Sequence, residues 1–198
     1  MNNNNNEYSE LNRKIFHLLT LAYPILYNII PLNISLILAG SLVVIDIIME
    51  SLRLMYPSIN KTVLKIFRSM YRKSEENNFS GLIWTLTGGF LTIFIFNDKK
   101  IVTTVLLYMC LGDSAAGLIG THHGKTKIGY WKYKTLEGSL ACFVVCFICG
   151  IFFLPWELAL IGAIIATIIE FLPLPLNDNF WLPLISGFLL TFLSKIFI

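Results

Sequence analysis

Hydrophobic residues along this chain fall into seven long runs that polar segments separate. A helix needs about 17–25 mostly apolar residues to cross a bilayer, and most of the runs lie near the lower end of that range. Seven transmembrane helices are therefore predicted. They occupy Ile15–Pro31, Leu32–Met49, Gly81–Phe96, Ile101–Gly120, Gly138–Leu154, Trp156–Leu172 and Phe180–Ile198.

The longest polar segment, Glu50–Ser80, has a helical periodicity of its own. Basic side chains fall on one face of the predicted helix and apolar side chains on the other. The basic set is Lys61, Lys65, Arg68 and Arg72, and the apolar set is Val63, Ile66, Phe67 and Met70. This pattern is typical of an amphipathic helix that lies on an anionic cytoplasmic leaflet. A part in admitting a lipid substrate is the alternative.

The composition supports a membrane protein. Of 198 residues, 56% are hydrophobic and only 14% are charged, and the mean hydropathy is +0.70, values that soluble domains do not reach. The predicted fold class is an all-α integral membrane protein with about seven transmembrane helices and a cytoplasmic amphipathic helix. Residues 1–12 form a polar tail that we expect to be disordered, and residues 13–198 form a single polytopic membrane domain. No cleavable signal peptide is expected.

The four cysteines do not predict a disulfide framework or a metal site. Cys110 lies inside a predicted span, and Cys142, Cys146 and Cys149 recur on one helical face. Neither His nor a carboxylate shares that face. We expect these side chains to pack as small hydrophobic groups.

Basic residues predict the orientation in the membrane. With seven spans, twelve of the 15 Lys and Arg residues lie on the side of the N-terminus. Lys99, Lys100 and Lys195 lie on the other side. Since cytoplasmic loops carry the excess of basic residues, the N-terminus is predicted to be cytoplasmic.

Acidic residues within or beside the predicted spans are costly, at about 2.5–3.5 kcal/mol each near a helix centre, and each therefore needs a reason. By the predicted topology they lie at a similar depth in the cytoplasmic half, as does His17. We interpret them as one site. They are Asp46, Asp113, Glu137, Glu170 and Asp178.

The segment GDSAAGLIGTHHGKTKIGYWKYKTLEGS, residues 112–139, combines a carboxylate with glycines and lysines. Lys125, Lys127, Lys132 and Lys134 follow Asp113 among Gly120, Gly124 and Gly129. Backbone N–H groups and lysine charges suit a polyphosphate, and nearby carboxylates suit Mg²⁺. An ordinary basic cytoplasmic loop is the alternative, and the sequence leaves both open. The pattern of a Walker A loop is absent. His122 and His123 are interpreted as polar loop residues.

A second polar segment, EFLPLPLNDNFWLP, joins the last two predicted helices. Pro173 and Pro175 end one helix, and Asp178 stands at the head of the next. Asp178 is either an N-cap or a contact to metal or substrate, and the sequence favours neither.

The chain resembles the CTP-dependent lipid kinases, which include dolichol kinase, phytol kinase and a CTP-using diacylglycerol kinase. The resemblance runs through the motifs RKIFH, DIIMESLRLMYPSIN, RKSEENNFSGLIWTLTG, GDSAAGLIGTHHGKTKIG, KTLEGS and LNDNFWLPL, in that order over nearly the whole chain. It implies transfer of the γ-phosphoryl group of CTP to the hydroxyl of a membrane lipid, with Mg²⁺ as cofactor.

The resemblance also implies roles for individual residues. Asp113, Glu137, Glu170 and Asp178 are the expected catalytic residues, and Asp113 and Asp178 the expected metal ligands. The nucleotide is expected at Arg13, Lys14, His17, Gly117, Gly120, Gly124, Lys125, Lys134 and Thr135. Asp46 and Asn179 are expected to contact the lipid. CTP, a lipid alcohol and the bilayer are the expected partners, nucleic acid is not, and a bacterial inner membrane is the expected location.

Two other functions remain open at this point. A phosphatidate cytidylyltransferase shares a motif similar to KTLEGS, but the longer C-terminal signature of that enzyme is missing here. A small proton-coupled transporter also uses intramembrane carboxylates. It predicts polar residues spread over the full depth of the bundle, whereas here they cluster on one side. The acceptor alcohol is a polyprenol, a phytol-like isoprenoid or diacylglycerol, and the sequence does not distinguish these.

Overall fold

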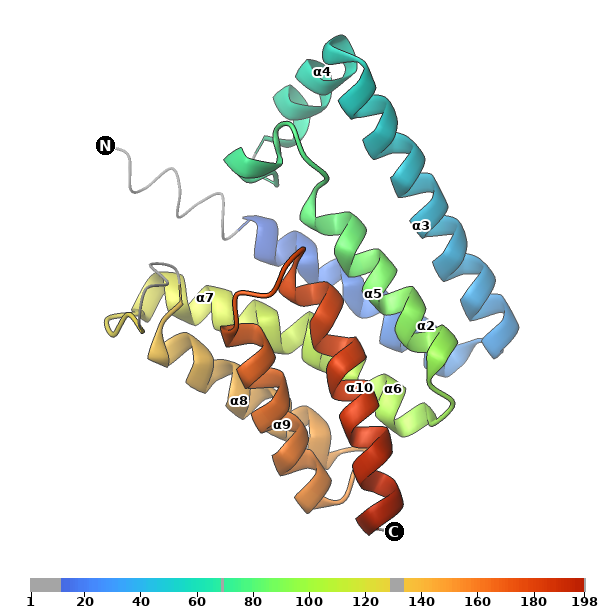
Figure 1. The fold of residues 1–198 in the computed structure, drawn as a ribbon, viewed down its shortest axis with the longest axis vertical. Helices are drawn as coiled ribbons and strands as arrows, with labels where there is room; N and C mark the ends of the chain where they lie inside the picture. Colours follow the sequence, from blue (N-terminus) through green and yellow to red (C-terminus); the bar gives the residue numbers. More distant parts are fainter. Residues whose placement is uncertain (1–11, 69, 129–133, 198) are drawn as a thin grey trace.

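The computed structural model describes residues 12–68, 70–128 and 134–197, and within these ranges the chain is almost entirely helical (Figure 1). Residues 1–11 of the predicted tail lie outside the described residues, whereas Asn12, which was assigned to the tail, begins a helical segment. An isolated antiparallel bridge between Lys127 and Thr135 is the one piece of strand-like pairing in the described part. The principal helices are α2 (Ala22–Ile29), α3 (Leu32–Met55), α4 (Pro57–Phe67), α5 (Gly81–Ile95), α6 (Lys99–Leu107), α7 (Asp113–His123), α8 (Leu136–Ile151), α9 (Trp156–Phe171) and α10 (Asp178–Phe197).

Each predicted apolar run forms helix. The first run is divided, because a 3₁₀ turn, Leu18–Leu21, separates the helical residues 12–17 from α2. The fourth run is continuous but changes its winding: a π-helical turn, Tyr108–Gly112, joins α6 to α7. Such turns are rare and occur often at functional sites.

The helix formed by α6, the π-turn and α7 lies at the centre of the bundle. The side chains of Val102, Val105 and Met109 on this helix are fully buried. Helix α8 packs on α7 and α9, and α10 packs on α5 and α9. Helix α3 lies at the outer edge beside α5, and α4 turns back from its end (Figure 1). The chain therefore has a packed core on one side and a loosely covered helix on the other.

Three helical segments in the described part are long and apolar enough to cross a membrane: Leu32–Met55, Lys99–His123 and Asp178–Ile196. Helices α5 and α8 are apolar but have only 15 and 16 residues. The prediction of an all-α chain is thus confirmed for the described residues, whereas the prediction of about seven transmembrane helices is not, because three helical segments reach spanning length. The short helices fall below the roughly 20 residues that a perpendicular crossing requires.

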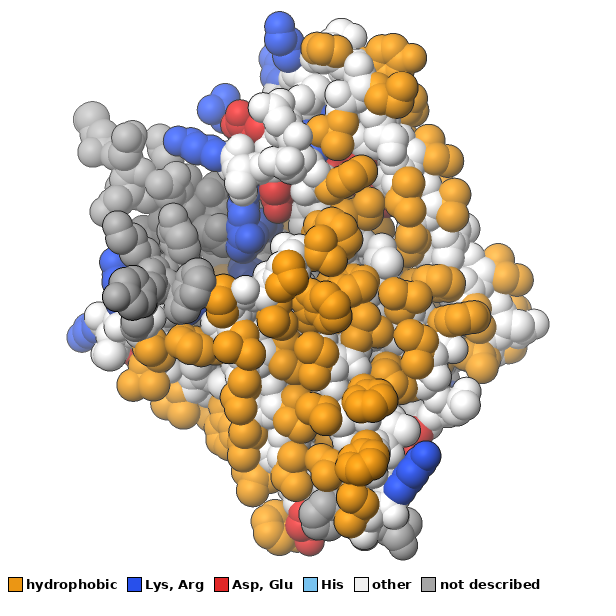
Figure 2. Space-filling view, viewed as in Figure 1, with side chains coloured by type: hydrophobic (Ala, Val, Ile, Leu, Met, Phe, Trp, Pro, Cys, Tyr) orange, Lys and Arg blue, Asp and Glu red, His pale blue; other side chains and the backbone are white. Residues whose placement is uncertain are grey.

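The surface matches a lipid environment. In Figure 2, hydrophobic side chains cover the middle of the face formed by α3, α5 and α10, and charged side chains gather toward the two ends. On α3, Ile37, Leu42, Ile45 and Ile48 are among many exposed apolar residues. A contiguous apolar surface of this kind marks contact with a membrane or with another apolar partner.

The amphipathic helix is shorter than predicted. Helix α4 ends at Phe67, so Arg72, which the periodicity placed on the same helix, lies beyond it as the N-cap of a 3₁₀ turn, Lys73–Glu75. The basic face of the helix is therefore reduced to Lys61 and Lys65, and Arg68 is its C-cap. The apolar residues Val63, Phe67 and Met70 line an internal cavity.

Small residues let α7 and α8 approach closely. A Cβ added to Gly138 would lie 2.7 Å from the Ala116 carbonyl oxygen, and one added to Gly112 would lie 2.5 Å from Cys146 Sγ. All four cysteines are buried and free, as predicted. Close packing of α8 is what brings the loop before it to the end of α7.

Candidate functional site

Three carboxylates from three helices meet at one point of the bundle. Asp113 begins α7, Glu170 is near the end of α9 and Asp178 begins α10. One carboxylate oxygen from each lies within 4.8 Å of the other two. Asp113 and Glu170 are buried, with 3% and 4% exposure. Residues separated by up to 65 positions in the sequence thus form the cluster that the sequence predicted.

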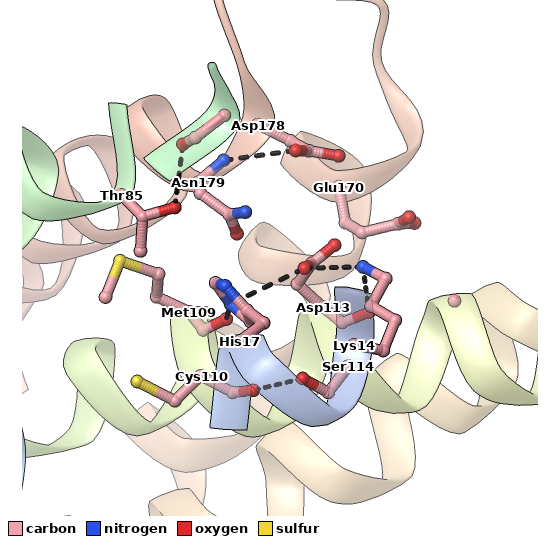
Figure 3. Close-up of polar contacts among 12 residues, drawn as sticks. Lys14, His17, Thr85, Met109, Cys110, Asp113, Ser114, Glu170, Asp178 and Asn179 are labelled. Carbon is pink, nitrogen blue, oxygen red and sulfur yellow. Dashed lines mark hydrogen bonds and ion pairs between the residues drawn. The ribbon is translucent and has the colours of Figure 1, made fainter. Parts of the chain in front are cut away.

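Asp113 has a buried cationic partner. Lys14 Nζ donates to Asp113 Oδ2 at 2.6 Å and to the Asp113 carbonyl oxygen at 3.0 Å (Figure 3). The lysine stem passes over Gly117, where an added Cβ would lie 2.1 Å from Lys14 Cε. A glycine is therefore required one turn after Asp113 so that Lys14 can reach the carboxylate. Gly117, which the resemblance placed at the nucleotide, thus lies against the side chain of Lys14.

Lys134 is the cation of the other two carboxylates. Its Nζ donates to a Glu170 carboxylate oxygen, to the Glu170 carbonyl oxygen and, at 3.1 Å, to Asp178 Oδ2. Burial alone would lower the pKa of Lys134, but the Asp178 and Glu170 carboxylates outweigh burial and raise it. Lys134 therefore remains an ammonium ion at neutral pH. The sequence implied that Lys134 binds a nucleotide phosphate. In this structure its ammonium group binds the carboxylates of Glu170 and Asp178 instead.

The cluster fits a divalent cation. Glu170 Oε2 is buried and lacks a hydrogen-bond partner among the described residues. A buried carboxylate oxygen without a partner is costly, and a bound cation would satisfy it. Carboxylate oxygens are the ligands that Mg²⁺ prefers. Asp113, Glu170 and Asp178 are the residues that would hold it.

Two further predicted residues face the same centre. His17 Nε2 lies 3.1 Å from the Met109 carbonyl oxygen and 3.6 Å from Asp113 Oδ2. Because a carbonyl oxygen only accepts, the Met109 contact requires the proton on Nε2. The Asn179 side chain is directed toward His17 (Figure 3), and its Oδ1 is buried without a partner in the described part of the chain.

An apolar cavity of about 560 Å³ opens from this centre. At the polar end it is lined by Lys14, His17, Asp113, Asp178 and Asn179. It continues between the N-terminal helical segment, α3 and α5, where most of the lining is hydrophobic, including Leu19, Leu26, Leu38 and Leu42. A cavity of this size and character is typical of a ligand site. The polar cluster and the apolar cavity are two parts of one space.

Asp46 and Arg13 also line this cavity. Asp46 comes from α3, and its Oδ2 is buried without a hydrogen-bond partner among the described residues. It is thus a carboxylate at an otherwise apolar wall, in a position to accept a hydrogen bond from a ligand hydroxyl.

The basic loop after α7 is ordered at both of its described ends. Leu136 N donates to the Thr126 carbonyl oxygen and Ile128 N to the Lys134 carbonyl oxygen. Thr135 caps α8 through its hydroxyl, which accepts from Gly138 N at 3.1 Å. Residues 129–133, which include Gly129 and Lys132, lie outside the described residues. The two described ends of the loop are therefore paired with each other and form the base of a hairpin.

The glycines of this region have structural roles beside the loop. A Cβ at Gly124 would lie 2.2 Å from the Gly120 carbonyl oxygen, and one at Gly120 would lie 3.1 Å from Thr135 Oγ1. Lys125 is exposed on the loop. His122 and His123 complete the last turn of α7, where both are exposed, and neither belongs to the carboxylate cluster.

Glu137 lies apart from the carboxylate cluster. Its side chain is half-buried and accepts from the Thr126 backbone N–H at 3.1 and 3.2 Å. The structure thus brings Asp113, Glu170 and Asp178 together but gives Glu137 a contact that closes the loop. The sequence placed all four near one surface because it could not show which way the first turn of α8 faces.

Asp178 is the first residue of α10, and Asn177 before it supplies the capping contact. Asn177 Oδ1 and Asp178 Oδ1 both accept from Asn179 N, at 3.0 and 3.1 Å, while Asp178 Oδ2 meets Lys134. Leu176, just before this turn, has a φ of 73°, which is uncommon for a residue with a side chain. Such backbone strain often accompanies functional sites.

Sequence reasoning missed a buried ion pair near the C-terminal end of α3. Arg53 and Glu50 pair through both carboxylate oxygens, at 2.9 and 2.8 Å, and Arg53 is only 1% exposed. Arg53 also donates to the carbonyl oxygens of Glu75, Glu76 and Asn78. Glu50 accepts from Ser80 N and the Tyr71 hydroxyl. The pair fixes the segment that lines one end of the cavity. An acidic and a basic residue three positions apart on α3 were its only signal.

Comparison with known proteins identifies three informative relatives. The CTP-dependent diacylglycerol kinase 1 of Eremothecium gossypii is 28% identical over 169 residues, which are 71% of this chain and 53% of that protein. Phytol kinase 1, chloroplastic, of Arabidopsis thaliana is 30% identical over 57% of this chain and 42% of that protein. An uncharacterized protein of Rickettsia prowazekii is 29% identical over 88% of this chain and 90% of its own length.

The chain spans about half the length of the first two relatives. The Rickettsia protein is matched nearly from end to end. No family model and no solved structure matches the chain. The resemblance found in the sequence motifs is thus supported by the fungal diacylglycerol kinase and the plant phytol kinase.

Proposed function

Because the chain belongs to the family of CTP-dependent lipid kinases, we propose that it transfers the γ-phosphoryl group of CTP to the hydroxyl of a membrane lipid alcohol. The observation that carries this proposal is the junction of two environments. Asp113 and Asp178, which lie beside Glu170, line the polar end of a cavity whose other walls are mostly apolar. A lipid alcohol has the same division between a hydroxyl and a hydrocarbon chain.

Phosphoryl transfer requires mainly positioning and neutralisation of charge. Mg²⁺ bound by Asp113, Glu170 and Asp178 would neutralise the charge of the nucleotide phosphates. Lys14, which is held on Asp113, keeps that carboxylate ionised and fixed in place. Lys134, Lys125 and the hairpin backbone supply further positive charge and N–H donors on the side where CTP would enter.

The acceptor hydroxyl would lie between Asp46 and Asp178, both of which line the cavity. Its oxygen forms a bond to the γ-phosphorus of CTP, the bond from that phosphorus to the β–γ bridging oxygen breaks, and CDP leaves. Asp46 accepts a hydrogen bond from the hydroxyl and orients it. The hydroxyl proton passes to Asp46 Oδ2, which has no hydrogen-bond partner among the described residues.

We further propose that the bundle crosses the membrane with the carboxylate cluster near the cytoplasmic face. The basic residues of α4 and of the loop after α7 support this orientation. The apolar cavity then opens toward the bilayer between α3 and the N-terminal helical segment, so the lipid enters from the side. The helices shorter than a full crossing would be accommodated by local thinning of the bilayer.

The decisive experiment uses purified protein, Mg²⁺ and CTP labelled at either the α or the γ phosphorus. A panel of diacylglycerol, phytol and a polyprenol serves as acceptors. The expected result is label in the lipid from γ-labelled CTP only. Transfer of α label as a CDP-lipid would identify a cytidylyltransferase instead. Transfer of neither label to any acceptor, together with solute flux in liposomes, would favour a transporter.

Asp113→Asn provides the matched control for this assay. The variant retains the shape of the side chain but loses the charge that binds the metal and pairs with Lys14. We expect it to insert in the membrane at the wild-type level and to have no measurable activity. Turnover close to that of the wild type would contradict the assigned site.

A further inference from the structure

The two lysines of the carboxylate cluster are held differently. Lys14 is 7% exposed, comes from a helix and lies against Gly117. Lys134 comes from the hairpin before α8, and its side chain is 27% exposed. Each ammonium binds both the carboxylate and the backbone carbonyl oxygen of one acidic residue, Asp113 for Lys14 and Glu170 for Lys134. Lys14 is therefore built into the core, whereas Lys134 has a path to solvent.

The charge of the cluster also distinguishes the two lysines. Three carboxylates face two ammonium groups, which leaves one negative charge in excess. A divalent cation added beside both lysines would leave an excess of positive charge. If the cation replaced Lys134, the three carboxylates would be balanced by the cation and Lys14. Buried charges are stable when they are paired in this way.

We infer that Lys134 is an exchangeable internal cation: it holds Glu170 and Asp178 together until a divalent metal ion displaces it, and it then binds the phosphates of the nucleotide. This inference rests on the proposed function and deepens it. Lys134 Nζ binds Asp178 Oδ2 at 3.1 Å and also binds Glu170, whose second oxygen, Oε2, is buried without a partner in the described part of the chain. The metal would therefore use ligands that Lys134 now occupies in part.

The exchange has a functional consequence. While Lys134 occupies the carboxylates, it competes with the metal. When a nucleotide offers phosphates to Lys134, that competition ends. Metal and nucleotide therefore bind with positive coupling, and by reciprocity each increases the affinity of the other by the same factor.

The first test measures binding without any lipid acceptor. Mn²⁺ binding to the purified full chain is followed by electron paramagnetic resonance for the wild type, Lys134→Gln and the control Lys125→Gln. We expect Lys134→Gln to bind Mn²⁺ about tenfold more tightly than the wild type, because a competing charge is removed. The factor by which CTP tightens Mn²⁺ binding should fall in this variant. Lys125→Gln, on the exposed part of the same hairpin, should bind Mn²⁺ as the wild type does. Unchanged or weaker Mn²⁺ binding in folded Lys134→Gln would overturn the inference.

A second test uses the wild-type protein and therefore does not depend on the folding of a variant. Lysines are labelled with a water-soluble amine reagent and Lys134 is quantified by mass spectrometry. Labelling should increase when Mn²⁺ is added and decrease again when CTP follows. Labelling that Mn²⁺ leaves unchanged, or that CTP does not lower again, would overturn the inference. A protein that shows this exchange but phosphorylates no lipid alcohol would refute the proposed function and leave the inference intact.

Discussion

Substitution of Gly117 by Ala tests how the buried lysine is placed. The added Cβ would lie 2.1 Å from Lys14 Cε, and ordinary contact begins at 3.4 Å, so the lysine stem must retreat by about 1.3 Å. The Lys14 Nζ to Asp113 Oδ2 distance, now 2.6 Å, would then exceed the range of a hydrogen bond. A hydrogen bond to a charged group contributes about 1.5–3 kcal/mol, which corresponds to a loss of about 10- to 150-fold in kcat/KM.

Intrinsic helix propensity predicts the opposite effect, since Ala is favoured over Gly by about 1 kcal/mol within a helix. The assay is γ-phosphoryl transfer with Gly117→Ala, Lys14→Ala and the double variant. Both single changes disrupt one contact, so the double variant should lose little more than either. Gly40→Ala is the control, because its added Cβ would meet only the flexible Phe90 ring at 3.3 Å. Wild-type activity in Gly117→Ala, or strictly additive losses, would refute the reasoning.

Three other predictions follow from the structure. Arg53→Met should lower the free energy of unfolding by about 3 kcal/mol and the midpoint of thermal unfolding by about 10 °C, because it leaves Glu50 buried without its partner. The double variant Arg53→Met, Glu50→Gln should lose less stability than Arg53→Met alone. An equal loss of stability in the two variants would contradict this prediction. Leu42→Trp should raise the KM for the lipid and leave the KM for CTP unchanged, since Leu42 lines the cavity. The control is Ile45→Trp, because Ile45 is exposed on the same helix but does not line the cavity. An equal effect of both substitutions would exclude lateral entry of the lipid at this wall. The pKa of Lys134 is raised in the folded protein, so its contribution to stability is fully present below the ordinary lysine pKa of about 10.4 and is lost only as the pH rises further. The difference in unfolding midpoint between the wild type and Lys134→Gln should therefore be constant between pH 6 and pH 9. A difference that varies within this range would contradict the prediction.

Much of the helical architecture was predictable from hydrophobic periodicity. The predicted run Trp156–Leu172 corresponds to α9, Trp156–Phe171, and Gly81–Phe96 to α5, Gly81–Ile95. Apolar runs bounded by Pro and Gly define helix ends well. The number of full crossings was not predictable in the same way, because the length of an apolar run does not reveal whether loops or caps end the helix early. Arg72 shows this, since α4 ends before it.

The site was predictable in its acidic members and less so in its cations. Asp113, Glu170 and Asp178 stand out because carboxylates are costly in apolar surroundings. The direction in which a side chain leaves a helix end depends on the neighbouring elements, so Glu137 could not be separated from them. The partners of Lys14 and Lys134 depend on contacts over 99 and 36 positions, which periodicity does not encode.

The π-turn Tyr108–Gly112 sets the rotational phase between two halves of one continuous helix. A π-turn holds one more residue than an α-helical turn over the same stretch. If the same residues wound instead as a regular α-helix, α7 would be rotated by about 100° relative to α6. The buried contacts of Val102 and Val105 on α6 would be kept, but Asp113 would turn away from Lys14. The extra residue of the π-turn thus lets α6 keep its buried contacts in the core while α7 directs Asp113 toward Lys14.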